Sequence, residues 1–199
     1  MTVDWFARLA GRTVVCIASG PSLGADDCDL VRASGWPVVV TNTTFRLCPW
    51  ADVLVAHDEA WWKLYRTEVQ AGFPGQKVCC APGGRRFGAQ WLGLQKHKTF
   101  RNSGAAAISL AVLAGAKRVV LLGYDCQHTG ARTHWHGDHP APLGNAGSVA
   151  RWPQTFRQVA QYAAQQRCEV LNATRATALT SFPRVRLEDV LPVPLEAAA

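Results

Sequence analysis

Short, continuous runs of Val, Ile and Leu recur along the chain, and a polar turn follows most of them. Runs of this kind are typical of strands that are buried on both faces of a parallel sheet. The segments with this character are 13–18, 38–41, 51–56, 76–81, 119–122 and 168–172. Their alternation with helical segments predicts an α/β fold, with an open, mainly parallel sheet and helices on both faces. Ligands of such sheets bind at the carboxyl ends of the strands.

The segments between the strands have helical patterns or the composition of loops. Helices are expected over residues 59–70, 105–114 and 149–166, and another should begin near the two aspartates at 26–27. The long segment 126–148 is rich in Gly, Pro, His and Asn and has no hydrophobic period. Loops longer than about 12 to 15 residues in compact domains are usually functional or mobile, so we expect a lid over an active site.

The composition is that of a globular protein, and we expect residues 1–199 to form one domain. Apolar residues make up 48% of the chain and charged residues 18%, without repeats or low-complexity tracts, which excludes a disordered chain and a solenoid. No apolar run reaches the roughly 20 residues of a membrane span. The first residues lack the basic and apolar segments of a secretory signal, so we expect a cytoplasmic protein. The tail, 183–199, should wrap the surface and fray after Leu195.

Charge and cysteine usage give weaker constraints. The net charge of +7 points to polyanions in general, but the basic residues form only small groups, so nucleic acid is a weakly supported partner. The seven cysteines are odd in number and lack Cys-x-x-Cys spacing, so we expect buried, reduced thiols. The sequence gives no oligomeric state.

The first apolar segment ends in the turn Ser19-Gly20-Pro21-Ser22. Gly20 permits close approach of the backbone to a ligand, Pro21 fixes the direction of the chain, and Ser22 can cap a helix or bind a phosphate. The turn is neither a Walker loop nor a Gly-x-Gly-x-x-Gly motif. Two interpretations stay open: a plain turn with a helix cap, and a phosphate-binding turn.

Further polar groups are expected at the same edge of the sheet. Asn42 follows the second strand, where its amide can read a base or a ribose or can cap the next turn. His57 and Asp58 follow the third strand, either facing a ligand or forming a structural ion pair. Ser103 and Gly104 open the Ala-rich helix, whose positive end suits a phosphate.

The long loop carries His134, His136 and His139 within six residues, and no apolar face is present there to bury them. One interpretation is a divalent metal site, formed by the imidazoles with Asp125 or Asp138. Another is a single imidazole that acts as a general base while its neighbours position it. A solvated surface loop is the plain alternative.

Taken together, these residues resemble a known grouping. Their order is the stretch 17–23, then Asn42, then Ser103-Gly104, then Gly123-Tyr124-Asp125, and finally a loop with histidines. This order is similar to that of the bacterial sialyltransferases that build lipooligosaccharide. It is also similar to the related 6-hydroxymethylpterin diphosphokinase-like (MptE-like) domains, many of which occur in flagellin-glycosylation and phage proteins. The similarity spans roughly residues 13–182.

The resemblance implies a Rossmann-like fold and a nucleotide-sugar-dependent glycosyltransferase with a glycan or another hydroxyl compound as acceptor. The nucleotide would be held by Ser19, Gly20, Pro21, Ser22, Asn42, Ser103 and Gly104. In the family, a histidine late in the loop is the general base that deprotonates the acceptor hydroxyl. His139 matches it best, His136 is next, and Asp125 is a third catalytic candidate. This chemistry requires no cofactor.

The chain departs from the sialyltransferases at three places. Ser19 stands where they have Asn, and His57-Asp58 replaces an Asn-Pro pair. Cys126-Gln127 replaces an aromatic pair whose tyrosine supports the departing phosphate. The donor and the support of the leaving group are therefore expected to differ from those of a sialyltransferase.

Two alternatives accompany this interpretation. The MptE-like relatives imply metal-dependent diphosphate or phosphate transfer, with a divalent ion near Asp58, Asp125 and the loop histidines. The alternative metal-ligand set is His134, His136, His139 and Asp58. The other alternative is a non-catalytic module that binds a nucleotide or a polyanion.

Overall fold

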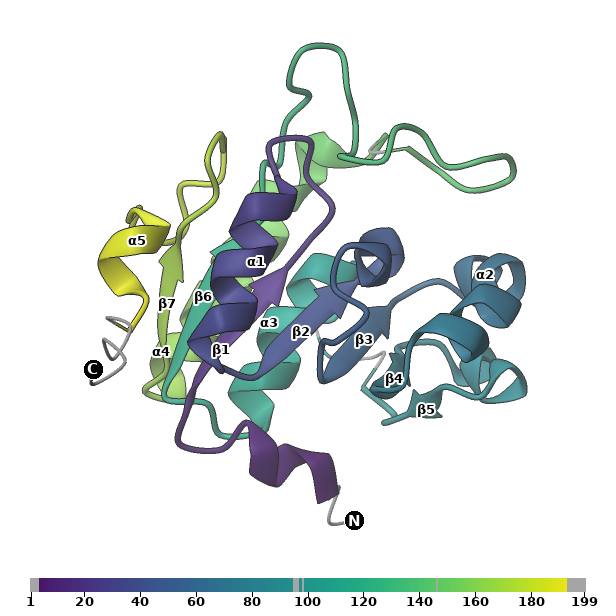
Figure 1. Cartoon of the computed structure of the whole chain (residues 1–199), viewed down its shortest axis with the longest axis horizontal. Coiled ribbons are helices and arrows are strands. Elements are labelled where there is room, and N and C mark those ends of the chain that lie inside the picture. The colour runs from purple at the N-terminus through teal and green to yellow at the C-terminus, as the bar shows by residue number, and fades with distance from the viewer. Residues whose placement is uncertain (1–3, 95–96, 98, 146, 193–199) are drawn as a thin grey trace, which may run out of the picture.

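A computed structural model describes residues 4–94, 97, 99–145 and 147–192. Its strands form one sheet in the order β5-β4-β3-β2-β1-β6-β7, and every pair of neighbours is parallel (Figure 1). The strands are β1 (Thr13–Ile17), β2 (Val38–Thr41), β3 (Val53–Ala56), β4 (Gln76–Cys79), β5 (Gln90–Trp91), β6 (Arg118–Leu122) and β7 (Glu169–Asn172). The predicted open, parallel, Rossmann-like sheet is confirmed.

The sheet changes its direction of growth between β1 and β6. From β1 to β5, each new strand is added on one side, and helix α3 (Ser103–Leu113) then returns so that β6 pairs with the other side of β1. The registers Cys16↔Leu121 and Ile17↔Leu122 bring the carboxyl ends of these two strands together. Open α/β sheets bind their ligands in the crevice outside such a switch point.

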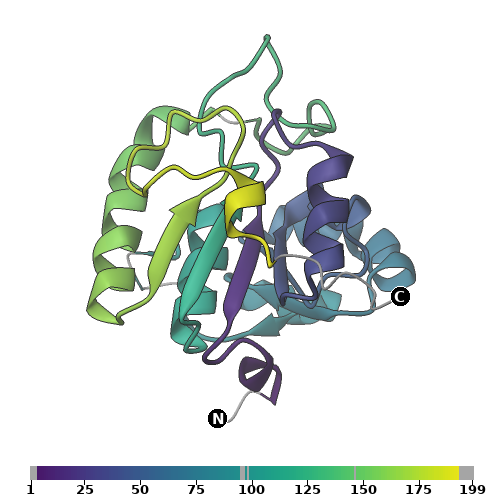
Figure 2. The same cartoon turned by 60° about the vertical axis from the view of Figure 1, so that its left-hand side comes forward.

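Both faces of the sheet are covered, which explains why its strands are continuously apolar. Val14 and Cys16 pack in a cluster with the residues of α3 and α4 (Trp152–Gln165). Val15 and Ile17 belong to the cluster on the opposite face, with residues of three other helices. These are α1 (Ala25–Ser34), α2 (Glu59–Gly72) and α5 (Leu187–Val190). Figure 2 shows α4 on one side of the sheet and α1 on the other.

Helix α3 is enclosed between the sheet and α4, as its small apolar residues predict. Its first turn is capped by Asn102, whose Oδ1 accepts a hydrogen bond from the Ala105 N–H at 2.8 Å. The cap belongs to Asn102, and Ser103 is the first helical residue. The start of the buried helix is thereby fixed at the carboxyl edge of the sheet.

The short elements were not predicted. Among the described residues, they are β5 and the 3₁₀ helices η1 (Asp4–Arg8), η2 (Asn42–Arg46), η3 (Pro82–Phe87) and η4 (Val149–Arg151). The helix expected over 149–166 therefore begins as a 3₁₀ turn and ends at Gln165. The tail carries α5, while Leu195 and its expected fraying lie outside the described residues.

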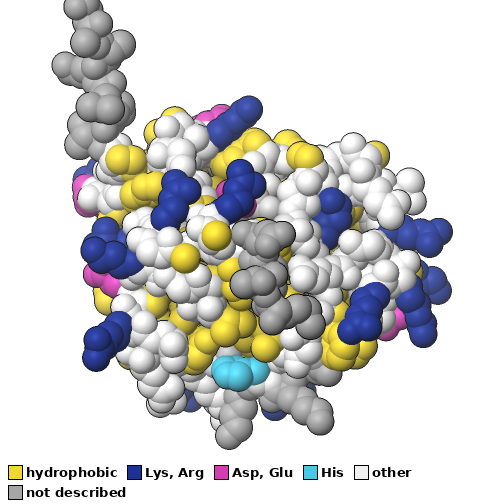
Figure 3. All heavy atoms as spheres, turned by 90° about the horizontal axis from the view of Figure 1, so that it is seen from below, with side chains coloured by type: hydrophobic (Ala, Val, Ile, Leu, Met, Phe, Trp, Pro, Cys, Tyr) yellow, Lys and Arg dark blue, Asp and Glu magenta, His cyan; other side chains and the backbone are white. Residues whose placement is uncertain are grey.

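Three other expectations concern the whole chain. All seven cysteines are free, and six of them are buried. Within the described ranges, each helix is too short or too polar to cross a lipid bilayer. On the face opposite the histidine loop, Lys and Arg side chains are spread over much of the surface, with hydrophobic and other uncharged side chains between most of them (Figure 3).

Candidate functional site

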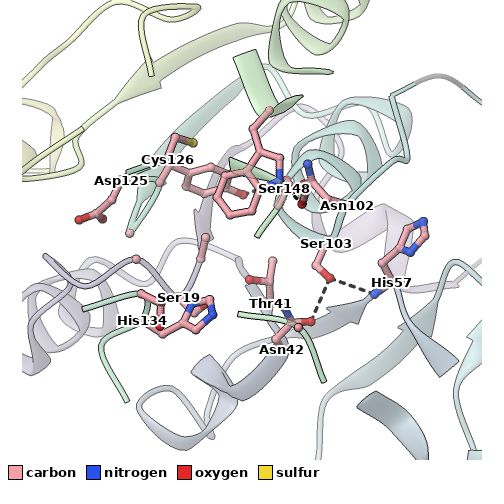
Figure 4. Close-up of a pocket in the computed structure, with 18 of the residues that line it drawn as sticks. Ser19, Thr41, Asn42, His57, Asn102, Ser103, Asp125, Cys126, His134 and Ser148 are labelled. Atoms are coloured by element: carbon pink, nitrogen blue, oxygen red, sulfur yellow. Dashed lines mark hydrogen bonds between the residues drawn. The ribbon is translucent and has the colours of Figure 1, made fainter. Parts of the chain in front are cut away.

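A pocket of about 450 Å³ lies at the carboxyl ends of β1, β2, β3 and β6 (Figure 4). Its volume is typical of sites for small ligands. The predicted residues that line it are Ser19, Gly20, Pro21, Asn42, His57, Asp58, Ser103, Gly104, Asp125, His134 and His139. The predicted residues Ser22 and His136 are not part of its wall. Segments that lie far apart in the sequence therefore meet at the switch point.

Ser22 and Asp125 hold the first turn in place. The Ser22 N–H donates to Oδ2 of Asp125 and the Ser22 hydroxyl donates to Oδ1, each at 2.9 Å. The hydroxyl also accepts a hydrogen bond from the Ala176 N–H at 3.3 Å. Ser22 therefore acts within the fold, although the sequence places it in a turn that could hold phosphate.

The same close approach between the first turn and Asp125 requires a glycine at position 20. The Gly20 N–H donates to the Gly123 carbonyl oxygen at 2.8 Å, and a Cβ on Gly20 would collide with Oδ1 of Asp125. The close backbone approach expected for a ligand is thus made to the chain after β6. Burial raises the pKa of Asp125, and its hydrogen bonds with Ser22 oppose that rise. With both carboxylate oxygens occupied, Asp125 is placed to brace the turn.

Asn42 and Ser103 meet across the pocket floor. The Ser103 hydroxyl donates to Oδ1 of Asn42 at 2.9 Å and accepts from the His57 N–H at 3.0 Å. Asn42 adopts the left-handed backbone conformation, with φ of 48°, which asparagine tolerates better than most residues. Because its oxygen is used, the amide nitrogen of Asn42 is the group left for a ligand. The His57 ring points away from these side chains (Figure 4).

The start of α3 forms the end of the pocket best suited to an anion. The Ala105 and Ala106 N–H groups bind Asn102, whereas those of Ser103 and Gly104 have no acceptor among the described residues. Free N–H groups at a helix N-terminus favour negative charge. Arg101, which was not singled out in the sequence, lines the same part of the pocket.

The histidine loop is packed against the protein. Nδ1 of His134 lies 3.3 Å from the Ser19 hydroxyl, and Nδ1 of His139 lies 3.4 Å from the hydroxyl of Tyr65 on α2. The Trp135 N–H donates to the Ser19 carbonyl oxygen at 3.1 Å. His134 and His139 are only 9% and 8% exposed, so the alternative of a solvated loop is wrong at these positions.

The three loop imidazoles form one cluster, with ring centroids 5.1 Å apart for His134 and His136, 5.0 Å for His134 and His139, and 4.7 Å for His136 and His139. Burial, and next the neighbouring histidines, lowers the pKa of His136 and His139 to about 4. Burial also lowers the pKa of His134. All three rings are therefore neutral near pH 7, which is the state that a general base requires.

The metal alternative is not assembled in this conformation. In the part of the chain that the structure describes, no group of three or more His, Cys, Asp or Glu side chains is arranged to hold a metal ion. Asp58, the carboxylate of the alternative set, pairs instead with His57, whose Nδ1 lies 3.2 Å away. That contact lowers the pKa of Asp58.

Comparisons with known proteins add no functional assignment. The sequence matches no model of a known protein family and no curated protein. Among solved structures, the chain is similar to UDP-glucose 4-epimerase from Brucella ovis in complex with NAD, with 13% identity and a TM-score of 0.29. The match covers 82% of this chain and 51% of the epimerase, so the chain spans about half the length of that structure. A likeness this weak identifies no family.

Proposed function

We propose that the protein is a nucleotide-sugar-dependent glycosyltransferase. The observation that carries the proposal is the meeting of two features in one pocket at the switch point: a helix start with free N–H groups, and the neutral imidazoles of His134 and His139. The first group suits the phosphate of a nucleotide, and the second suits the activation of a hydroxyl. The order of motifs that resembles the lipooligosaccharide sialyltransferases supports the same proposal.

The nucleotide would lie between the first turn and α3. Its phosphate would accept hydrogen bonds from the N–H groups of Ser103 and Gly104, and Arg101 would balance its charge. The amide nitrogen of Asn42, which the contact with Ser103 leaves free, would donate to the base or the ribose. This arrangement needs only groups that the fold already presents.

His139 would act as the general base. Its Nδ1 faces Tyr65, so Nε2 is the nitrogen available to the pocket. The acceptor O–H proton moves to Nε2, the acceptor oxygen forms a bond to the anomeric carbon, and the bond from that carbon to the phosphate oxygen breaks. The nucleotide leaves with the bonding electron pair. A base with a pKa of about 4 is weak, but negative charge on a bound substrate raises the pKa toward the working pH.

Isothermal titration with nucleoside monophosphates, nucleoside diphosphates and nucleotide sugars tests the binding step. We expect one of them to bind in a 1:1 complex, and Asn42→Ala and Arg101→Gln to weaken it. His128→Gln is the matched control, because His128 is an exposed histidine of the same loop outside the pocket wall. The absence of binding by every nucleotide would overturn the proposal.

The chemical step is tested by release of the nucleotide from the donor that binds. We expect His139→Gln to slow release by about 10²–10⁴-fold, the usual contribution of a general base, while the affinity for the nucleotide stays unchanged. The two alternatives receive less support. Asp58 and Asp125 are engaged with His57 and Ser22, and the basic residues are scattered on the face seen in Figure 3.

A further inference from the structure

The cluster of loop histidines contains two buried nitrogens without a hydrogen-bond partner among the described residues. Nε2 of His134 and Nε2 of His136 are buried, and in the described part of the chain neither has a hydrogen-bond partner. Nearly all buried polar atoms in proteins have one. His134 is 91% buried and lines the pocket, so a group bound there is the natural partner for its Nε2.

The charges around the histidine cluster favour the binding of an anion. Besides the imidazoles, the positive charge of Arg46 on η2 lowers the pKa values of His136 and His139 by electrostatic repulsion. Arg46 is itself paired with Glu68, whose carboxylate accepts from Nη2 at 2.7 Å. Tyr65 of α2 offers a neutral hydroxyl.

The loop contributes two more titratable groups near the cluster. Asp138, whose carboxylate accepts a hydrogen bond from the Thr133 hydroxyl, opposes the depression of the pKa of His134 and His139. The exposed His128 acts in the opposite direction on His134. Among the described residues, Asp138 is the one carboxylate whose charge acts on His134 and His139, and a single added proton would make the cluster cationic.

We propose that His134 and His139 form a subsite for an anionic group, a carboxylate or a phosphate carried by the acceptor sugar, and that its binding draws a proton into the histidine cluster. This inference rests on the proposed function and names its acceptor class: an acidic sugar. The anion accepts a hydrogen bond from Nε2 of His134, and the proton comes from solvent. The ring centroids of His134 and His139 are 5.0 Å apart, and two protonated imidazoles at that distance repel each other. A protonated His134 therefore leaves His139 neutral, as a base must be.

Matched sugars test the subsite. Glucuronate and glucose differ by a carboxylate, and glucose 6-phosphate replaces it with a phosphate. Titrations near pH 6.5, in buffers of different ionisation enthalpy, should show both acidic sugars binding about tenfold more tightly than glucose. They should also show uptake of about one proton per acidic sugar. The two acidic sugars distinguish the carboxylate from the phosphate as the preferred anion.

Variants then locate the effect. His134→Gln should abolish both the preference and the proton uptake. His128→Gln removes only the smallest of the effects on the pKa of His134 and should keep both. The wild-type measurement stands without any variant, so a misfolded His134→Gln protein leaves the test intact. Equal affinity for glucuronate, glucose 6-phosphate and glucose would overturn the inference. A metal ion found on the histidines of the purified protein by elemental analysis would do so as well.

Failure of the inference is distinguishable from failure of the proposed function. The nucleotide titrations use the other end of the pocket, where Ser103, Gly104 and Arg101 lie. If a nucleotide binds but acidic sugars show no preference, the glycosyltransferase proposal stands and only its acceptor class is wrong. If no nucleotide binds, the proposed function itself fails.

Discussion

A tight constraint on a single residue lies at Gly20, where the turn after β1 touches the chain after β6. A Cβ there would collide with the Asp125 carboxylate and would lie 2.5 Å from the Gly123 carbonyl oxygen. We expect Gly20→Ala to lower the free energy of unfolding by about 1–3 kcal/mol, because the Gly123 carbonyl belongs to the backbone and the Asp125 carboxylate is held by two hydrogen bonds from Ser22. Urea unfolding measures this loss. The matched control is Gly72→Ala at the end of α2, where a Cβ meets nothing within 4 Å, and equal stability of the two variants would refute the argument.

The loop histidines make stability depend on pH. In the unfolded chain a histidine has a pKa near 6.5, whereas burial lowers the pKa of His136 and His139 to about 4 in the folded protein. Between these values the unfolded state binds more protons, so the free energy of unfolding falls as the pH falls from about 6.5 to 4. Urea unfolding at a series of pH values should show this slope.

Removal of one ring should flatten the slope. His136→Gln deletes one group whose pKa is lowered by burial and by the neighbouring His139 and His134. His128→Gln removes an exposed residue outside the cluster, whose effect on the pKa of His134 is the smallest of those acting there, and should keep a slope close to that of the wild type. If His136→Gln and the wild type have the same pH dependence, the cluster does not control it.

At the scale of elements, the start of α3 is set by one side chain. Asn102→Ala removes the acceptor for the Ala105 N–H, and we expect a loss of about 1 kcal/mol, the usual cost of an N-cap. Asn102→Asp retains an acceptor and serves as the control. Thermal unfolding followed by circular dichroism compares the two. An Asn102→Ala protein as stable as Asn102→Asp would show that the cap contributes nothing.

Elements with a strong local pattern could be predicted, and elements without one could not. The apolar run at 38–41 gives β2 with its exact bounds, and the Ala-rich segment gives α3. Strand β5 has only two residues, Gln90 and Trp91, and pairs only with the end of β4, so no periodic signal marks it. The 3₁₀ helix after β2 begins at Asn42 in a left-handed conformation that the sequence does not encode.

At the scale of the whole molecule, the site depends on contacts between distant segments. The sequence correctly places Ser19, Asn42, Ser103 and His139 at one edge of the sheet, because parallel strands end there together. It could not show that Ser22 turns toward Asp125 or that His139 meets Tyr65. These partners lie far apart in the chain, and only the packed fold brings them together.

The segment that follows β7 (residues 173–186), called here the C-terminal segment, completes the support of the turn after β1. Figure 2 shows it passing beside the carboxyl ends of the strands. The Arg175 guanidinium binds both oxygens of the buried Asp27 on α1, at 2.8 to 3.0 Å, and the Ala178 N–H donates to the Asp125 carbonyl oxygen at 2.8 Å. The turn is thus held from β6 on one side and from the C-terminal segment on the other.

Loss of the contact between Arg175 and Asp27 should reduce both the stability of the fold and the affinity for the nucleotide. We expect Arg175→Met to lower the free energy of unfolding by about 1–3 kcal/mol, because the buried Asp27 carboxylate loses its cation. Nucleotide affinity should fall with it, since the residue after Arg175 donates to Ser22 of the turn. The control is Arg186→Met, because Arg186 pairs only with exposed carboxylates at 3.7 and 3.9 Å, and such pairs contribute little. Urea unfolding and nucleotide titration check both effects, and equal behaviour of the two variants would contradict a role for the C-terminal segment in the site.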